Sequence, residues 1–328
     1  MTQLTQPQLK AVAEKIVLSQ GNKFIKELLR RNNIKIGKNK DEFLVNLHQG
    51  IDDGLIDQAK IDEWLRDIEG WGNQHVYLFE LPQIAINNLA DAMNGSPYSA
   101  ILEDHENYEF PEDLALKTAT LSDAELSLGW REGRDSWVRA RARDYRQEHD
   151  GDEYEFRAYR EKSERKIARF LWEFDEPFCA IYITHPNEPG VHEQVLTQIW
   201  LDLSTLAVTP IPLQKISLSE SFSRLNQKPE LKVNSVKMNV DGGHVNLVAT
   251  APETGIHDVE AIRHAQNGID ANQFTSSDGV FHFNEENLPG LSKQVKVEGS
   301  GTDSRIRIWA QCTREEVGLI VSEVNASR

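Results

Sequence analysis

Two groups of basic residues have the types and spacing that could do chemistry in this sequence. The first lies in the N-terminal fifty residues and comprises Lys26, Arg30, Arg31, Lys35, Lys38 and Lys40. The second is an alternating stripe of Arg139, Arg141 and Arg143, with Trp130, Trp137 and Tyr145 beside it. Clustered Lys and Arg side chains bind phosphates, and aromatic rings among them can stack on bases. Both groups therefore indicate contact with a nucleic acid.

The first basic group lies on a predicted helix, an extended link and a second helix. Apolar residues share one helical face before the link (Phe24, Leu28 and Leu29) and another after it (Phe43, Leu44 and Leu47). Between the helices, Ile34-Lys35-Ile36 alternates apolar and basic residues, which indicates extended chain. Asn39 is the expected N-cap of the second helix. A helix start beside Lys38 and Lys40 would offer backbone N–H groups and positive charge to a phosphate.

This arrangement resembles the SAP module, a helix-extension-helix fold that commonly contacts DNA. The residues that match its pattern are Leu28, Leu29, Ile34, Ile36, Gly37, Lys40, Phe43, Leu44 and Leu47. The resemblance covers about residues 21–50 and implies that the first basic group binds duplex DNA. Two alternatives remain: the lysines serve only to keep a helical hairpin soluble, or the hairpin binds a protein.

The arginine stripe lies on a predicted strand over residues 137–145, with its partner strand over residues 153–160. On one face of such a sheet the arginines could hold a nucleic-acid backbone while the aromatic rings stack on bases. The alternative is a ladder of cross-strand ion pairs, because carboxylates lie close by in the sequence (Asp144, Glu148, Asp150, Asp152, Glu153 and Glu155). A docking surface for a protein partner is a third interpretation.

The charge distribution favours the N-terminal group over the rest of the chain. The 328 residues carry a net charge of −16, the wrong sign for a protein covered by nucleic acid. Residues 1–50 nevertheless hold nine Lys and Arg against four Asp and Glu, a local charge of +5, which leaves −21 on the other 278 residues. A polyanion would therefore be confined to a local basic module and repelled elsewhere.

The remaining pattern predicts an α+β fold, with an N-terminal all-helical domain before a mostly antiparallel α+β body. Helical spacing around the hairpin places the first domain at residues 1–72. Period-two patterns predict an antiparallel-sheet domain at residues 73–209, in which residues 191–201 form a strand. A smaller α+β domain follows at residues 210–328, after the break at Pro210-Ile211-Pro212.

Local signals identify several elements of these domains. A β-hairpin is predicted around His149-Asp150-Gly151-Asp152, and another around Asp241-Gly242-Gly243. The last predicted helix spans residues 315–324 and has Thr313 as its N-cap.

Other chemistries find little support in the sequence. The histidines lack the spacing of a zinc hydrolase, and the acidic segment at residues 103–113 lacks the pattern of a calcium loop, so no metal or cofactor is expected. Cys179 and Cys312 are expected to be reduced thiols. Asp202, Lys296 and Glu298 could belong to a dispersed, metal-dependent nuclease site, but nothing at short spacing joins them.

The sequence thus favours a non-catalytic, DNA-associated accessory or adaptor protein. Its N-terminal module would contact duplex DNA, while the acidic body would bind a protein partner or form a homo-oligomer. The first alternative is an assembly subunit without DNA contact, and the second is the dispersed nuclease. Without a long apolar run or an apolar N-terminal signal region, we expect no membrane contact and a cytoplasmic location, or a nucleoid or nuclear one if DNA is bound.

Overall fold

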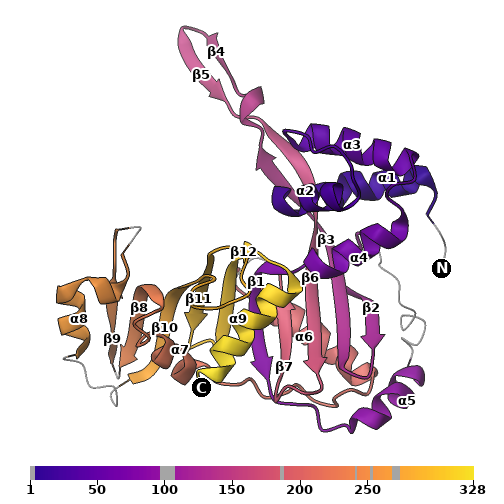
Figure 1. Ribbon diagram of the computed structural model, residues 1–328. Helices are drawn as coiled ribbons and strands as arrows, with labels where there is room; N and C mark the ends of the chain where they lie inside the picture. Colours follow the sequence, from indigo (N-terminus) through magenta and orange to yellow (C-terminus); the bar gives the residue numbers. More distant parts are fainter. Residues whose placement is uncertain (1–3, 97–107, 185–187, 241, 252–253, 268–273) are drawn as a thin grey trace.

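The computed structural model describes residues 4–96, 108–184, 188–240, 242–251, 254–267 and 274–328. Helices at the N-terminus precede a ten-stranded antiparallel sheet, which confirms the predicted α+β fold (Figure 1). Residues 103–107 of the acidic segment at residues 103–113 lie outside the described residues.

The N-terminal helices pack around a core of their own. They are α1 (Gln6–Lys15), the 3-10 turn η1 (Val17–Ser19), α2 (Asn22–Arg31), α3 (Lys40–Asp52) and α4 (Gln58–Ile68). Phe24, Leu28, Phe43 and Leu47 are buried in this core, as the apolar spacing predicts. Asn39 caps α3, with its side chain accepting a hydrogen bond from the Glu42 backbone N–H at 2.9 Å. The predicted helical hairpin is therefore present.

One sheet contains every strand outside the β4–β5 hairpin, in the order β2-β3-β6-β7-β1-β12-β11-β10-β8-β9. The strands are β1 (Gly72–Phe79), β2 (Ala115–Leu121), β3 (Glu125–Arg139), β6 (Tyr159–Glu173), β7 (Cys179–Ile183), β8 (Lys232–Val240), β9 (Gly243–Val248), β10 (Phe274–Phe283), β11 (Val295–Ser300) and β12 (Arg305–Gln311). The central strand β1 pairs with β7 on one side and β12 on the other. The domain boundary predicted at residues 209–210 falls between two helices, and the sheet continues across it.

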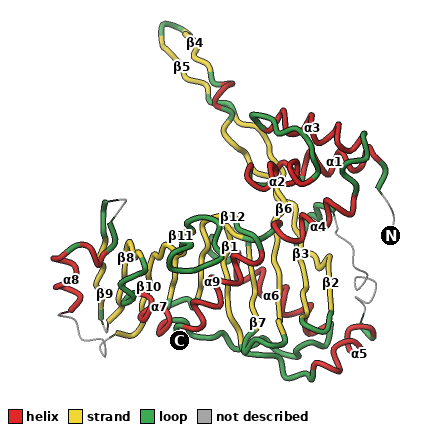
Figure 2. Tube along the Cα trace, viewed as in Figure 1, coloured by secondary structure: helices red, strands yellow, loops and turns green. Residues whose placement is uncertain are grey.

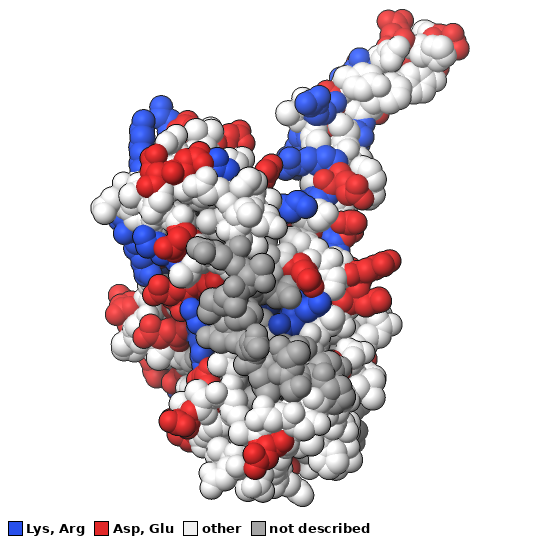
Figure 3. Space-filling model, turned by 90° about the vertical axis from the view of Figure 1, so that its right-hand side faces the viewer, with Lys and Arg blue, Asp and Glu red and all other residues white. Residues whose placement is uncertain are grey.

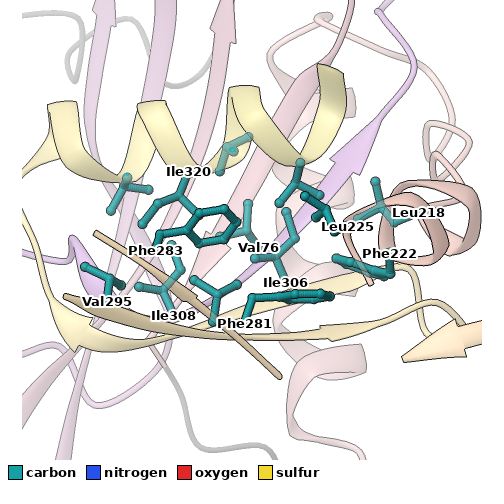
Figure 4. Packing of buried hydrophobic residues seen from close by; sticks show 14 of the residues in the cluster. Val76, Leu218, Phe222, Leu225, Phe281, Phe283, Val295, Ile306, Ile308 and Ile320 are labelled. Carbon is teal, nitrogen blue, oxygen red and sulfur yellow. The ribbon is translucent and has the colours of Figure 1, made fainter. Parts of the chain in front are cut away.

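Helices cover opposite faces of the two halves of the sheet. Helix α6 (Val191–Thr205) packs on β1, β7, β6 and β3, while α7 (Ser219–Leu225) and α9 (Arg314–Ala326) pack on the other face, over β8, β10, β11 and β12 (Figure 4). Shorter elements are η2 (Ile86–Asn88), α5 (Leu89–Asn94), η5 (Ile256–Asp258) and α8 (Glu260–Asn267). Thr313 caps α9, as predicted, by accepting from the Glu316 backbone N–H.

The prediction of a strand over residues 191–201 is wrong, because this segment is the first part of α6. Val195, Ile199 and Leu203 recur at intervals of four residues and are buried against the sheet, the spacing of a helix face. Gly190 precedes the helix with φ of 79°, a left-handed conformation that glycine adopts without steric cost.

A long arm leaves the sheet at β3 and β6. These strands pair along their full lengths, from Glu125 opposite Glu173 to Arg139 opposite Tyr159, and continue beyond the rest of the sheet (Figures 1 and 2). The arm then turns through η4 (Arg141–Arg143) and ends in a separate hairpin of β4 (Tyr145–His149) and β5 (Asp152–Phe156). The predicted hairpin is present, and its turn is the two residues Asp150 and Gly151, both of which have positive φ.

The prediction of one continuous strand over residues 137–145 is wrong. Strand β3 ends at Arg139, and a 3-10 turn contains the next two arginines of the stripe. The predicted partner segment is likewise divided, between β5 and β6. The strict alternation of Arg and apolar residues suited a strand, but the chain turns where β4 and β5 begin to pair with each other.

Specific contacts join the helical domain to the sheet. The buried Glu69 carboxylate pairs with the Arg165 guanidinium of β6, whose Nε lies 3.0 Å from Glu69 Oε1. The Gln311 side chain of β12 accepts from the Gly21 backbone N–H at 2.6 Å and donates to Gln20. Trp71 is buried between these contacts, with the Arg169 guanidinium 4.4 Å from its ring centroid. The helical domain is thereby held against the end of the sheet.

We expect Glu69→Ala to lower the free energy of unfolding by about 3 kcal/mol, because it leaves the Arg165 charge buried without its carboxylate. Urea denaturation followed by tryptophan fluorescence measures this loss. The double variant Glu69→Leu with Arg165→Met should lose less, since neither charge then stays buried. A stability for Glu69→Ala within 1 kcal/mol of the wild type would contradict this assignment.

Candidate nucleic-acid interface

Lys40 and Glu42 occupy the helix start that was predicted to hold a phosphate. The Lys40 ammonium donates to the backbone oxygens of Leu18 and Gln20 at 2.5 and 3.2 Å, so it caps the end of η1. Burial, and then the nearby Lys162 ammonium, lowers the pKa of Lys40. The Lys38 backbone N–H donates to the Glu42 carboxylate at 2.9 Å. Intramolecular partners therefore occupy the Lys40 ammonium and the backbone N–H groups of Lys38 and Glu42 at the start of α3.

The other N-terminal cations divide between internal contacts and solvent. The Lys26 ammonium lies 5.9 Å from the centroid of the Phe43 ring, and Arg31 pairs with Glu27 at 2.5 Å. Arg30, Lys35 and Lys38 are exposed to solvent, and the paired Arg31 side chain is also 63% exposed.

The arginine stripe is not one basic sheet face. Arg139 pairs with Asp144 at 2.5 Å, and its hydrogen bond to that carboxylate raises the pKa of Arg139. Arg141 and Arg143 are exposed on η4. Trp130 lies far from any ligand surface, because it is buried and donates to the Asp202 carboxylate at 2.7 Å. Of the predicted aromatic neighbours, Trp137 and Tyr145 are exposed.

A different cationic surface arises where β8, β10, β11 and β12 lie side by side. Along β12, Ile306 and Ile308 point to the core under α9, so Arg305, Arg307 and Trp309 lie on the opposite face. The strand registers bring further residues of that face alongside them. We call this surface the cationic sheet face and define it by Lys232, Lys237, His282, Lys296, Arg305, Arg307 and Trp309. Among the described helices, none packs on it.

Trp309 lies on β12, at one edge of this face, beside two of its cations. Its ring is 41% exposed, with the Arg307 guanidinium 3.4 Å and the Lys296 ammonium 5.0 Å from the ring centroid. Its indole N–H donates to the Glu298 carboxylate at 3.2 Å, which fixes the orientation of the ring. Guanidinium and ammonium groups over an aromatic ring are favourable contacts, and they leave the ring beside concentrated positive charge.

The positive groups on this face repel one another. Burial, and then the ammonium groups of Lys232 and Lys296, lowers the pKa of His282. The pKa of Arg307 is lowered by burial and by Arg305, against the opposing effect of Glu298. The carboxylates of Glu298 and Asp278 lie on the same face, and Asp303 pairs with Arg305 at 3.5 Å, but the five Lys and Arg outnumber these three carboxylates. A bound polyanion would relieve this repulsion.

A buried polar cluster borders the face along β1. The Tyr77 hydroxyl lies 2.7 Å from His192 Nδ1, and the His75 and His192 ring centroids are 4.6 Å apart. The Lys215 ammonium lies 4.6 Å from the centroid of the Tyr77 ring. Burial, then the charges of His192, Arg305 and Arg307, lower the pKa of His75 to about 3. Because both histidine rings and Tyr77 are buried, they support the edge of the surface and are not positioned to contact a ligand.

The cationic sheet face was missed because its residues come from four segments distant in sequence. The segment Arg305-Ile306-Arg307-Ile308-Trp309 alternates basic or aromatic residues with apolar ones, which is a local signal. The sequence predicts this segment and residues 232–239 as strands, but not that they share a sheet.

Comparison with models of known protein families, with curated proteins and with solved structures finds no match for this chain. Within the described part of the chain, no three His, Cys, Asp or Glu side chains gather as a metal site would require. The described helices are each too short or too polar to cross a lipid bilayer.

We expect stability to fall between pH 6.5 and pH 4.5 because of His75. An unfolded histidine binds its proton near pH 6.5, whereas His75 in the folded protein does so near pH 3. The unfolded state therefore binds more protons in this interval, and acid favours it by about 2 to 3 kcal/mol at pH 4.5.

Urea denaturation at a series of pH values measures this effect. His75→Phe, which keeps a ring against His192, should flatten the pH dependence, while His149→Gln at the exposed tip of the arm should not. An unchanged pH dependence in His75→Phe would contradict the assignment.

Proposed function

We propose that this protein is a non-catalytic nucleic-acid-binding accessory protein that holds a single strand across the cationic sheet face. The observation that carries the proposal is the gathering of five Lys and Arg with the exposed Trp309 on one sheet face of a chain whose net charge is −16. An acidic protein that concentrates positive charge on one uncovered face favours a negatively charged ligand there and repels it elsewhere.

Three features support a nucleic acid as that ligand. The cations are distributed over four adjacent strands, which suits a chain of phosphates better than one compact anion. Trp309 offers a ring on which a base can stack, and open sheets with aromatic residues bind single strands in this way. The long Lys and Arg side chains can follow a flexible backbone, whereas a surface four strands wide is too broad to enter a duplex groove.

The SAP-like hairpin is a second candidate for the contact, favoured by the exposure of Arg30, Lys35 and Lys38. Its α2 begins beside the end of β12, where the Lys23 ammonium donates to the Ser292 hydroxyl at 2.6 Å. A single strand of nucleic acid that is bound on the cationic sheet face would therefore pass next to this helical hairpin where it leaves the face. Duplex DNA bound by the hairpin alone is the competing outcome.

We expect the full chain to bind fluorescent single-stranded oligonucleotides with steep salt dependence. Five neutralised phosphates would give a slope of log K against log salt of about −3.5, or roughly a hundredfold loss between 50 and 200 mM salt. Trp309→Ala should weaken binding by about 1 to 3 kcal/mol through lost stacking. Fluorescence anisotropy at two salt concentrations measures both effects.

A matched pair of charge reversals distinguishes the two surfaces. Lys237→Glu with Lys296→Glu alters the sheet face, and Lys35→Glu with Lys38→Glu alters the hairpin by the same total charge. The proposal expects the first pair to abolish binding and the second to weaken it only slightly. Loss of binding in the hairpin pair alone, or a preference for duplex DNA that Trp309→Ala leaves unchanged, would overturn it.

A further inference from the structure

The outer part of the arm lacks a core among the described residues. Every residue of β4 and β5 is exposed, and a two-stranded hairpin by itself is at best marginally stable in water. The arm also presents five large aromatic side chains to solvent, with exposed fractions between 43% and 69%: Trp137, Tyr145, Tyr154, Phe156 and Tyr159. Such a concentration of exposed aromatic rings on a protruding element is typical of an interaction surface.

The aromatic residues lie on defined faces of the arm. Tyr145 is opposite Phe156 in the β4–β5 register, and their rings stack with centroids 4.8 Å apart. Tyr154 lies opposite Gln147 and so shares that face. Nearer the sheet, the Arg139 guanidinium lies 5.6 Å from the centroid of the Tyr159 ring. These contacts hold the rings in place before any partner binds, which lowers the entropic cost of association.

The charge of the arm is divided into two equal and opposite parts. The tip, residues 145–156, has one Arg and five Asp or Glu, a net charge of −4. The neck, residues 139–144 and 157–160, has five Arg and one Asp, a net charge of +4. Figure 3 shows acidic groups at the end of the arm and basic groups below them.

We propose that two copies of this chain associate through their arms, lying antiparallel so that the acidic tip of each contacts the basic neck of the other. A two-fold axis between the arms would make both contacts equivalent, as in a C2 homodimer. The aromatic residues would be buried between the arms, and the free edges of β4 and β5 would be available for pairing.

A second copy fits this surface better than a nucleic acid does. The acidic tip repels phosphates, so a nucleic acid could use only the neck and would leave the tip and its aromatic rings exposed. When a second copy lies antiparallel to the first, its basic neck faces the acidic tip of the first copy and its acidic tip faces the basic neck. This inference does not depend on the proposed nucleic-acid function, because the arm lies on β3 and β6, away from the four strands of the cationic sheet face.

The test uses charge reversals in the full chain and analytical ultracentrifugation. The neck variant is Arg141→Glu with Arg143→Glu, and the tip variant is Glu148→Lys with Asp152→Lys; none of these four side chains has an ion pair among the contacts described here. The wild type is expected to sediment as a dimer at micromolar concentration. Each variant alone should weaken dimerisation at least tenfold, since the altered surface then has a net charge of zero and its new side chains carry the same sign as the surface that they meet.

The decisive measurement restores opposite charges at the contacts. An equimolar mixture of the neck and tip variants should form a heterodimer, because one contact joins the unchanged acidic tip to the unchanged basic neck, and at the other the introduced Lys side chains meet the introduced Glu side chains. A single chain carrying all four substitutions should also form homodimers, because the introduced Lys side chains of each tip then meet the introduced Glu side chains of the other neck. Far-UV circular dichroism should be unchanged in every variant, as the substituted side chains lie outside the three buried cores.

Two results would overturn the proposal. The first is a wild-type chain that stays monomeric up to about 100 μM, well above the micromolar affinities of ordinary weak complexes. The second is a wild-type dimer that survives the neck and tip substitutions, or whose loss in folded variants is not reversed by mixing them.

Discussion

The central strand β1 buries both of its faces, and the arrangement of the whole body depends on this. Val76 and Leu78 point into the core beneath α7 and α9, whereas Tyr77 and Phe79 point into the core beneath α6. Because the side chains of a strand alternate, one strand can belong to two cores on opposite faces. Each group of helices can then cover its own half of the sheet, and the opposite face of each half needs no helix.

The two cores lie on opposite faces of the two halves of the sheet, and this explains where charged surface is available. On the β8–β12 half, the face away from α9 carries Lys and Arg side chains that would be costly to bury without partners. The β3–β6 half instead continues into the arm. The proposed nucleic-acid surface and the proposed self-association surface could therefore coexist, since they lie on different strands. Two linked copies would hold two cationic faces together, which raises the effective concentration of the second binding site.

Elements that depend on neighbouring residues could be predicted from the sequence, whereas elements that depend on packing or strand pairing could not. Asn39 and Thr313 were identifiable as N-caps because a cap depends on residues within one helical turn. The turn at Asp150-Gly151 was identifiable because its positive φ values suit these residues. Residues 191–201 contain apolar residues at both helical and strand spacing, and packing against the sheet selects the helix. The turn at Arg141–Arg143 was hidden, because alternation predicts a strand while giving no information on where pairing changes partner.

The sequence by itself determined the α+β class, the helical N-terminal domain with its hairpin, and the uneven charge. These follow from apolar periodicity, capping residues and composition, which act over a few residues or over the whole chain. Only the tertiary structure decided that Lys40 bonds to Leu18 and Gln20, and that Arg305, Arg307, Trp309 and Lys296 share one face. Such groupings depend on which distant strands pair. Strand pairing is set by the packing of entire cores, and no local pattern encodes it.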